Sequence, residues 1–508
     1  MEKGRHLNPS IQVRKFKENA MSINRRQFMQ GAFAAGVAGT TGMLGSGSAF
    51  SAVHNPVGEA QAELFGKFKG NVVLLPSKYG GYVQAMDLSV PETLAWYSYG
   101  LHGIDMPIPH HIAAMPSADP YKGFDFYQTM QPPASPYVNE NSPEWRNRGD
   151  FKMFKMRYDG SGKQNSISVV NDIGETTGMS LGVHVSIGVG ENANKYVAFA
   201  DGQKDMVLIT DLGDNPKIVK AFRADYDPVA RQLNISHIFP DATTGKFDYV
   251  GRKGMKTTHE AMLGEELMPA DPTAVFVDAF TWHPTLPFGA ILIRRLGCCA
   301  IIDTRTWEVV ALLSTAKGSP DNFPMVKQTG FTWTFAVPSV LTPLHEAGFI
   351  TSGEYFVACN NVLQNNIAVY RSTDENPNKW KKETFVEGFG TKYLPLHMGN
   401  VPDSRFVYFT MWARKPNNGY ICKVDAKTWQ VVAKWDTGPD PHTCDCTVDG
   451  KYMTTVYSGH QAGQSGLVVI NVATDKIEAR LPCPGGMHDH VVVPDSWEGL
   501  KFSRSTSV

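Results

Sequence analysis

Short stretches of alternating apolar and polar residues, separated by turns, recur along the chain from about residue 65. Each copy is an apolar strand that ends in Asp or Asn, a turn rich in polar residues and a second strand. This pattern is typical of a β-hairpin. The clearest copies are residues 301–310 (IIDTRTWEVV), residues 423–432 (KVDAKTWQVV) and, more weakly, residues 469–477 (VINVATDKI). A further apolar strand precedes each hairpin, as at 289–293, 406–410 and 452–456.

These four-stranded units repeat at intervals of about 50 to 60 residues, which predicts an all-β protein of the β-propeller type. A propeller grows by whole blades, so residues 53–508 are expected to form a single domain of seven blades. Long helical periodicity is confined to about residues 259–267. The proline- and aromatic-rich segment 116–149 is expected to be an irregular connection that covers one face of the disc.

Residues 1–52 are predicted to be an export signal that is removed from the mature protein. Residues 24–29 (NRRQFM) form a twin-arginine pattern, which an apolar, Gly/Ala-rich run from 31 to 45 and several small residues follow. The run is too short and too rich in glycine to span a bilayer. We therefore expect export by the Tat pathway and a mature, soluble protein in the bacterial periplasm.

The charge balance and the cysteines exclude several classes of function. Without residues 1–52 the chain has 41 basic and 47 acidic residues, which argues against binding to nucleic acid or to an anionic membrane surface. The seven cysteines follow neither a disulfide framework nor a zinc spacing. We expect most of them to be small, buried apolar residues.

Seven histidines form one set, because most of them precede the inner strand of a predicted blade. A proline-flanked pair, His110-His111, is followed by five single histidines that each lie just ahead of a strand-like segment: His184, His345, His397, His442 and His488. The last four are separated by 52, 45 and 46 residues, close to one blade with its loops. One side chain from each blade can therefore converge on the central channel.

Seven converging imidazoles predict a metal site, because neutral imidazole is the commonest metal ligand. Nitrogen-rich ligation suits copper, zinc, iron or nickel rather than calcium or magnesium, and more than four histidines favour a multinuclear site. Six further histidines lack this spacing and are expected to be structural or to support the ligands: His102, His237, His259, His283, His460 and His490.

The order of one His-His pair and five single histidines resembles the N-terminal propeller of nitrous oxide reductase. It more closely resembles the copper-containing thiocyanate dehydrogenase family, whose members are periplasmic and consist of a lone propeller. Lys78, in the sequence PSKYGGY of residues 76–82, also looks like that family. The resemblance covers essentially the whole mature chain, and we expect no counterpart of the cupredoxin domain of nitrous oxide reductase.

This resemblance implies a trinuclear copper site in the central channel. The implied copper ligands are His110, His184, Asp278, His345, His397 and His488. The implied catalytic residues, which hold the substrate and transfer protons, are Lys78, His111, Glu260 and His442. Glu265 and Glu266 remain alternatives to Glu260.

The implied reaction is the oxidation of thiocyanate with water to cyanate and sulfur. Two electrons would pass to an external acceptor such as a periplasmic c-type cytochrome, since the sequence contains no Cys-x-x-Cys-His motif for its own haem. The sequence leaves open whether the protein forms a homodimer.

Two other functions remain open from the sequence. A reductase similar to nitrous oxide reductase, fed by an external donor, would need all seven histidines for a sulfide-bridged cluster; Lys78 and Asp278 favour the other chemistry. A propeller that binds copper or a partner protein without turnover would carry the same residues, because a fold alone does not determine a function.

Overall fold

Seven antiparallel β-sheets contain nearly all of the described secondary structure, so the all-β prediction is confirmed. The computed structural model describes residues 67–78, 80–102, 108–131, 152–179, 184–202, 204–247, 273, 275–338, 343–360, 364–390, 392–413, 418–457, 465–483 and 485–502. These residues belong to one compact unit, 53–508. The predicted export signal, the expected helix at 259–267, and Glu260, Glu265 and Glu266 lie outside the described residues.

In five of the seven sheets, four consecutive strands form a meander from an inner to an outer strand. The first sheet takes its inner strand from the C-terminal end of the described chain, and the third is extended by three further strands. The first sheet contains β31 (Val491–Val492), β1 (Val72–Ser77), β2 (Tyr82–Asp87) and β3 (Glu92–Ser98); the second contains β4 (Ile108–Ala114), β5 (Gly123–Gln131), β6 (Met153–Asp159) and β7 (Ser166–Asp172). The third contains β8 (His184–Ile187), β9 (Tyr196–Asp201), β10 (Met206–Asp211) and β11 (Ile218–Asp227), extended by β12 (Gln232–His237), β18 (Thr332–Ala336) and β17 (Met325–Thr329).

The remaining four sheets have four strands each. The fourth contains β13 (Val277–Trp282), β14 (Phe288–Ile293), β15 (Cys298–Asp303) and β16 (Glu308–Ser314); the fifth contains β19 (Leu344–Phe349), β20 (Tyr355–Asn360), β21 (Asn366–Arg371) and β22 (Lys381–Val386). The sixth contains β23 (Tyr393–Asn400), β24 (Phe406–Ala413), β25 (Gly419–Asp425) and β26 (Gln430–Gly438); the seventh contains β27 (Cys444–Cys446), β28 (Tyr452–Tyr457), β29 (Gly466–Asn471) and β30 (Lys476–Pro482). The helices are short: η1 (Tyr99–His102), α4 (Ile173–Thr177), η2 (Gly190–Asn192), η3 (Pro377–Lys379) and η4 (Gly499–Phe502).

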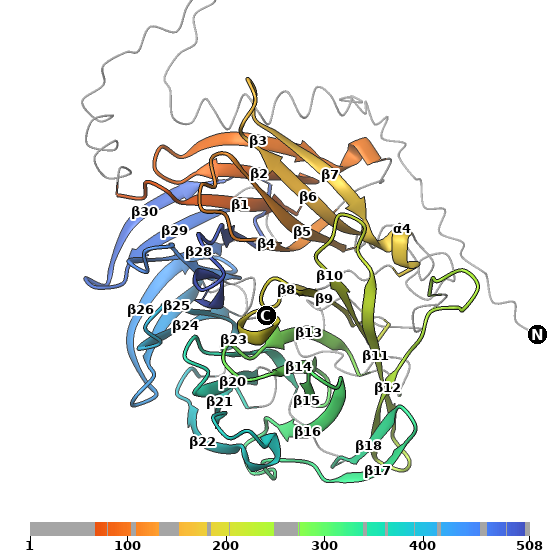
Figure 1. Cartoon of the computed structure of the whole chain (residues 1–508). Coiled ribbons are helices and arrows are strands. Elements are labelled where there is room, and N and C mark those ends of the chain that lie inside the picture. The colour runs from red at the N-terminus through yellow and green to blue at the C-terminus, as the bar shows by residue number, and fades with distance from the viewer. Residues whose placement is uncertain are drawn as a thin grey trace, which may run out of the picture. The chain divides into compact units, whose positions relative to one another are not determined.

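The inner strands of the seven sheets contact one another in a closed cycle (Figure 1). The order of contacts is β1, β4, β8, β13, β19, β23, β27 and β31, and β31 contacts β4 and pairs with β1. This radial arrangement of meanders is the architecture of a β-propeller. It brings the inner strand of every sheet to one central region, although these strands are far apart in the sequence.

Strands from both ends of the described chain share the first sheet. Val73 and Leu74 of β1 pair with Val492 and Val491 of β31. Beyond this short ladder, the backbone N–H of Val493 donates to the carbonyl of Val72 over 2.9 Å. The pairing closes the cycle of sheets, because β31 lies on the inner side of β1.

The repeated hairpin turn has the same geometry in all three copies. The Asp or Asn at the end of the first strand accepts the N–H of the residue two positions later: Asp303 from Arg305, Asp425 from Lys427 and Asn471 from Ala473, over 2.9 to 3.0 Å. The residue two positions further on has a positive φ: Trp307 62°, Trp429 54° and Asp475 58°. Asp and Asn favour such turns because their side chains can bond to the following backbone, so the pattern found in the sequence reflects a local geometry that recurs within this chain.

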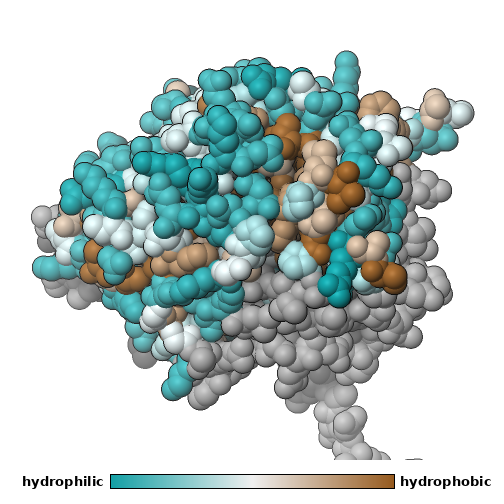
Figure 2. Space-filling view, turned by 90° about the horizontal axis from the view of Figure 1, so that it is seen from below, coloured by the Kyte–Doolittle hydropathy of each residue, from teal (hydrophilic) through white to brown (hydrophobic). Residues whose placement is uncertain are grey.

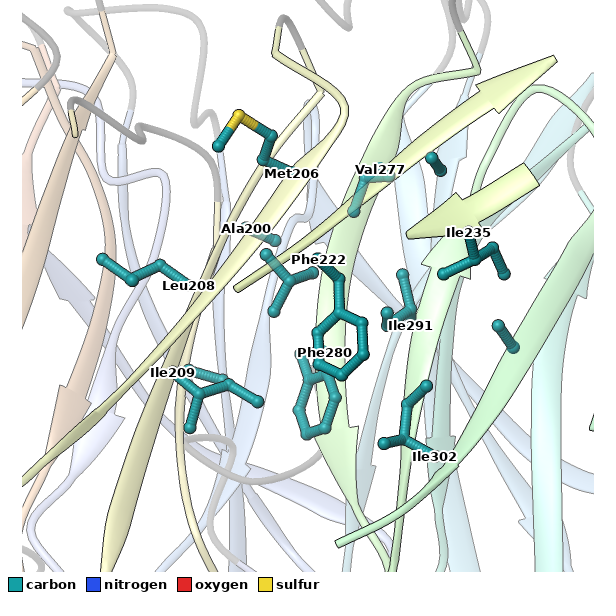
Figure 3. Packing of buried hydrophobic residues seen from close by; sticks show 14 of the residues in the cluster. Ala200, Met206, Leu208, Ile209, Phe222, Ile235, Val277, Phe280, Ile291 and Ile302 are labelled. Atoms are coloured by element: carbon teal, nitrogen blue, oxygen red, sulfur yellow. The ribbon is translucent and has the colours of Figure 1, made fainter. Parts of the chain in front are cut away.

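Apolar side chains fill the space between neighbouring sheets. Figure 3 shows this between the third sheet, with Ile209 and Phe222, and the fourth, with Phe280 and Ile291. Figure 2 shows mostly hydrophilic residues, with smaller hydrophobic patches, on the described part of one face. All seven cysteines are free and buried, as predicted. No helix among the described residues is long and apolar enough to cross a membrane.

One predicted element is wrong. The segment 116–149 was expected to lack regular structure, but its part 123–131 is strand β5, which pairs with β4 and β6. Proline at 116 and 120 and the aromatic residues around 124–127 concealed a strand whose apolar side chains are buried. Residues 132–151 lie outside the described residues.

Candidate metal centre

Four of the inner strands contain a β-bulge, and each bulge contains one or two of the predicted site residues. In each bulge, two residues of the inner strand lie opposite one residue of the next strand. The bulged pairs are His110-His111, Asp278-Ala279, His345-Glu346 and Leu396-His397. Successive residues of a regular strand point to opposite faces. A bulge changes the direction of a side chain, so two neighbours can point into one site.

The other three histidines lie at the inner ends of their sheets. His184 is the first residue of β8, His442 precedes β27, and His488 precedes β31. The backbone N–H of His442 donates to the carbonyl of Val456 over 3.0 Å. The sequence predicted the histidines just ahead of the strands, whereas five of the seven lie within them.

All seven histidines converge and are at least 97% buried: His110, His111, His184, His345, His397, His442 and His488. The ring centroids form a continuous series: His110 to His488 4.2 Å, His488 to His442 3.7 Å, His442 to His397 4.3 Å and His397 to His345 4.9 Å. His111 joins the series 4.3 Å from His110, and His184 lies 3.8 Å from His111. These residues come from six of the seven sheets or from the segments that lead into them.

Ligand nitrogens form two compact groups in this cluster. One group contains His110, His111 and His488, and the other contains His345, His397 and His442; within each group the nitrogens lie within 4.8 Å of one another. Both groups include a histidine that the resemblance assigns to proton transfer, His111 or His442. His184 and Asp278 belong to neither group.

Asp278 lies beside His184 instead. Its Oδ1 atom is 3.7 Å from Nε2 of His184, and its Oδ2 atom is 3.6 Å from the guanidinium of Arg294. Asp278 is fully buried, and burial raises its pKa to about 6, while Arg294 acts in the opposite direction. A buried carboxylate beside a histidine is a suitable metal ligand, because a bound cation would stabilise its charged form.

Lys78 lies close enough to the cluster to affect it electrostatically. Its side chain is 5% exposed, and burial lowers its pKa to about 7. The pKa of His488 is well below its usual range because of burial first, then His442, Lys78 and other neighbours. A neutral imidazole is the form that binds metals, so the site keeps His488 in that form.

Three buried charged residues beside the cluster were not predicted from the sequence. Glu346 contacts Nδ1 of His397, Asp489 lies 3.0 Å from Nδ1 of His111, and Arg294 faces Asp278. Glu346 and Asp489 directly follow His345 and His488, so an acidic residue next to a cluster histidine was the signal that could have identified them. Nothing in the sequence around Arg294 marks it.

Three of the other histidines bond to groups outside the cluster. His237 bonds to the carbonyl of Trp307, His283 to that of Ser372, and His490 to the hydroxyls of Thr443 and Thr454. These contacts fit the structural roles that the sequence predicted for them. The side chains of His102, His259 and His460 lie outside the described part of the chain, as does Glu260.

The donors of the cluster fit copper. Seven buried imidazoles and one carboxylate offer mostly nitrogen ligands, which copper, zinc, iron and nickel prefer. A cluster with more than four such donors exceeds the needs of one four-coordinate ion. The site therefore suits more than one transition-metal ion.

No family model matches the chain, and no curated protein matches it. Several solved structures are similar at low identity. They include a protein from Lactobacillus plantarum (10% identity, TM-score 0.48, 83% of this chain and 98% of that one) and a putative 6-phosphogluconolactonase from Bacteroides fragilis (11%, 0.46, 84% and 98%). Another is the dihydro-heme d1 dehydrogenase NirN (14%, 0.45, 85% and 76%). No TM-score among these reaches 0.5, so the assignment of the site rests on the residues of this chain.

Proposed function

We propose that this protein is an exported, periplasmic copper oxidoreductase of the thiocyanate dehydrogenase type. In the proposed reaction, thiocyanate and water give cyanate, elemental sulfur, two protons and two electrons. The carbon–sulfur bond breaks, a carbon–oxygen bond forms, and the electrons leave to an external acceptor such as a c-type cytochrome. The convergence of the seven buried histidines is the single observation that carries the proposal.

The proposal includes a propeller of seven blades, one for each of the seven sheets. The closed cycle of contacts among the inner strands supports this count. Six blades, or the segments leading into them, would then supply histidines, and the fourth would supply Asp278. The centre of the disc would hold the site.

The six proposed ligands form three pairs of neighbouring donors, which supports three copper ions. His110 and His488 have ring centroids 4.2 Å apart, and those of His345 and His397 are 4.9 Å apart. The third pair is His184 with Asp278, whose nearest atoms are 3.7 Å apart. Other measured ring separations among these ligands exceed 6 Å, such as 6.2 Å between His110 and His184. Copper, when bound, would accept electrons and polarise the substrate as a Lewis acid.

Lys78 would hold the anionic substrate. It is buried beside His488, and its pKa of about 7 makes it partly protonated near neutral pH. A thiocyanate ion that enters this region would favour the protonated ammonium, because an opposite charge nearby stabilises the charged form. The lysine would thus neutralise the charge of the substrate in a buried site.

His111 and His442 would transfer the protons released from water. His111 lies between His110 and His184, and His442 lies between His397 and His488, so each adjoins two proposed ligands. An imidazole is suited to this role because its pKa is near neutral. Glu260, which the sequence resemblance implies, would be the third proton-transfer residue.

The experiment is turnover of thiocyanate by copper-loaded protein with an artificial one-electron acceptor, with cyanate and copper measured on the same sample. The proposal predicts cyanate in proportion to bound copper and two equivalents of reduced acceptor per cyanate. His442→Ala should abolish turnover while most copper remains. A fully loaded sample that forms no cyanate would refute the proposed reaction.

A further inference from the structure

Two pairs of adjacent residues at the cluster share one arrangement. In each pair, the second residue is not one of the proposed ligands. In His345-Glu346 and in His488-Asp489, a cluster histidine is followed directly by a buried carboxylate. Each carboxylate contacts Nδ1 of another histidine, and that histidine belongs to the same compact group of nitrogens. The two groups thus repeat one relationship, built from different sheets.

Asp489 is held in place by the backbone on both of its oxygens. Oδ2 accepts the N–H of Ile112 over 2.9 Å and lies 3.0 Å from Nδ1 of His111. Oδ1 accepts the N–H of His490 over 2.8 Å. Both oxygens of this carboxylate therefore act as hydrogen-bond acceptors. The hydrogen on the ring of His111 must then lie on Nδ1, because two acceptors do not form a hydrogen bond.

Glu346 has the equivalent place in the other group. It is the second residue of the β19 bulge, it has no exposed surface, and it contacts Nδ1 of His397 in β23. The bulge explains how His345 and Glu346, although adjacent in the chain, both reach His397. His397 in turn lies in the bulge of the next sheet, and its own N–H donates to the hydroxyl of Thr410 over 3.1 Å.

We propose that Asp489 and Glu346 are positioning residues that fix His111 and His397 as the Nδ1–H tautomer and thereby present Nε2 of each ring to the metal centre. A carboxylate that accepts the ring N–H orients the imidazole and increases the basicity of its other nitrogen. For His397 the result is a better metal ligand. For His111 it is a nitrogen ready to accept a proton.

This inference rests on the proposed metal centre but not on the identity of the substrate. A positioning role of these carboxylates and a purely structural role also predict different experimental results. A carboxylate that only held the strands together would affect stability, and its replacement would leave the tautomer of the ring unchanged. An amide in its place can donate as well as accept, so the ring loses its preference, as in the loss of the correct tautomer when a catalytic Asp becomes Asn.

The first test is nitrogen NMR of the copper-free protein labelled with ¹⁵N-histidine, at about pH 8, where imidazoles are mostly neutral. His111→Gln and His397→Gln identify the two signals. In the wild type we expect both rings as the Nδ1–H tautomer. Asp489→Asn should change only the His111 signal, and Glu346→Gln only that of His397.

The second test is copper affinity, measured by competition with a chelator. Glu346→Gln should weaken it 10- to 100-fold, the usual effect of losing such a partner. The control is Asp303→Asn, which removes a largely buried carboxylate that bonds to Arg305, away from the cluster. It should change neither readout.

The outcomes separate the possible failures. If His111 and His397 of the wild-type protein are the Nε2–H tautomer, the inference is overturned. This result does not depend on whether any variant folds. Unchanged tautomers and unchanged copper affinity in folded variants would also overturn it. A protein with the expected tautomers and affinities that does not oxidise thiocyanate would refute the proposed reaction alone.

Discussion

The backbone N–H of Lys78 donates to the carbonyl of Gly486 over 3.0 Å, which joins the end of β1 to the segment just before His488. The hydroxyl of Ser77 donates to the neighbouring carbonyl of Gly485 over 2.9 Å. The contacts of β1 with residues 485–492 therefore close the cycle of sheets and also bring Lys78 to the histidine cluster.

Val492 tests how much the closure of the cycle of sheets contributes to the stability of the protein. Its side chain is 1% exposed and lies in the core between the first and seventh sheets. Val492→Ala should lower the free energy of unfolding by about 2 kcal/mol, from lost apolar burial and the cavity left behind. Chemical denaturation measures this value. The control Val432→Ala, at a half-exposed position of β26, should change it by less than about 0.5 kcal/mol.

Lys78 predicts how substrate binding depends on pH. Its pKa of about 7 means that the ammonium is mostly charged below pH 7 and mostly neutral above it. The affinity for thiocyanate should therefore fall as the pH rises through 7. Lys78→Met should bind weakly at every pH, and Lys78→Arg, which stays charged, should lose the dependence in this range. A wild-type affinity that rises from pH 6 to pH 9 would contradict this role.

Thr410 connects two cluster histidines through its hydroxyl. The hydroxyl accepts the N–H of His397 over 3.1 Å and donates to the carbonyl of His442 over 2.5 Å. Thr410→Val keeps the shape but leaves both backbone groups without this partner, at a cost of about 1 to 3 kcal/mol. We expect lower stability and incomplete copper loading, measured by thermal unfolding and metal analysis. Thr410→Ser, which retains the hydroxyl, should recover most of the copper.

His283, which lies outside the site, should make the stability of the protein sensitive to acid. Burial lowers its pKa from 6.5 to about 4, and Nδ1 accepts the N–H groups of Thr285 and Leu286, as a neutral ring must. The unfolded chain takes up this proton near pH 6.5 and the folded protein only near pH 4. The free energy of unfolding should therefore fall by about 3 kcal/mol as the pH drops through this range.

His283→Gln removes this titrating group. The variant should be less stable at pH 7, because it loses part of the bonding around the ring, but its stability should decline less between pH 6.5 and pH 4. Urea unfolding at a series of pH values measures both slopes. Equal slopes in the two proteins would show that His283 does not contribute to acid unfolding.

The repeats and the histidine spacing were sufficient to predict the all-β fold and which histidines meet. Both follow from a local rule: one hairpin pattern, with an Asp or Asn at the turn, recurs in the chain, and one histidine accompanies most copies. Lys78 and Asp278 came from the resemblance, and the structure places both beside cluster histidines.

The bulges could not be predicted, because a bulge depends on the register between two strands rather than on the residues of one. In a regular strand, His345 and Glu346 would point to opposite faces, so nothing in the sequence indicated that Glu346 belongs to the site. Asp489 was missed for a related reason: its partner, His111, lies 378 positions away and becomes a neighbour only when β31 closes the cycle. Arg294 likewise comes to face Asp278 only in the folded protein.

The most direct test of the metal centre is anomalous X-ray diffraction at the copper edge from crystals of the copper-loaded protein. We predict three copper peaks, one beside each of the donor pairs His110 with His488, His345 with His397, and His184 with Asp278. Crystals that contain copper but show no anomalous peak within bonding distance of any of these histidines would contradict the proposal.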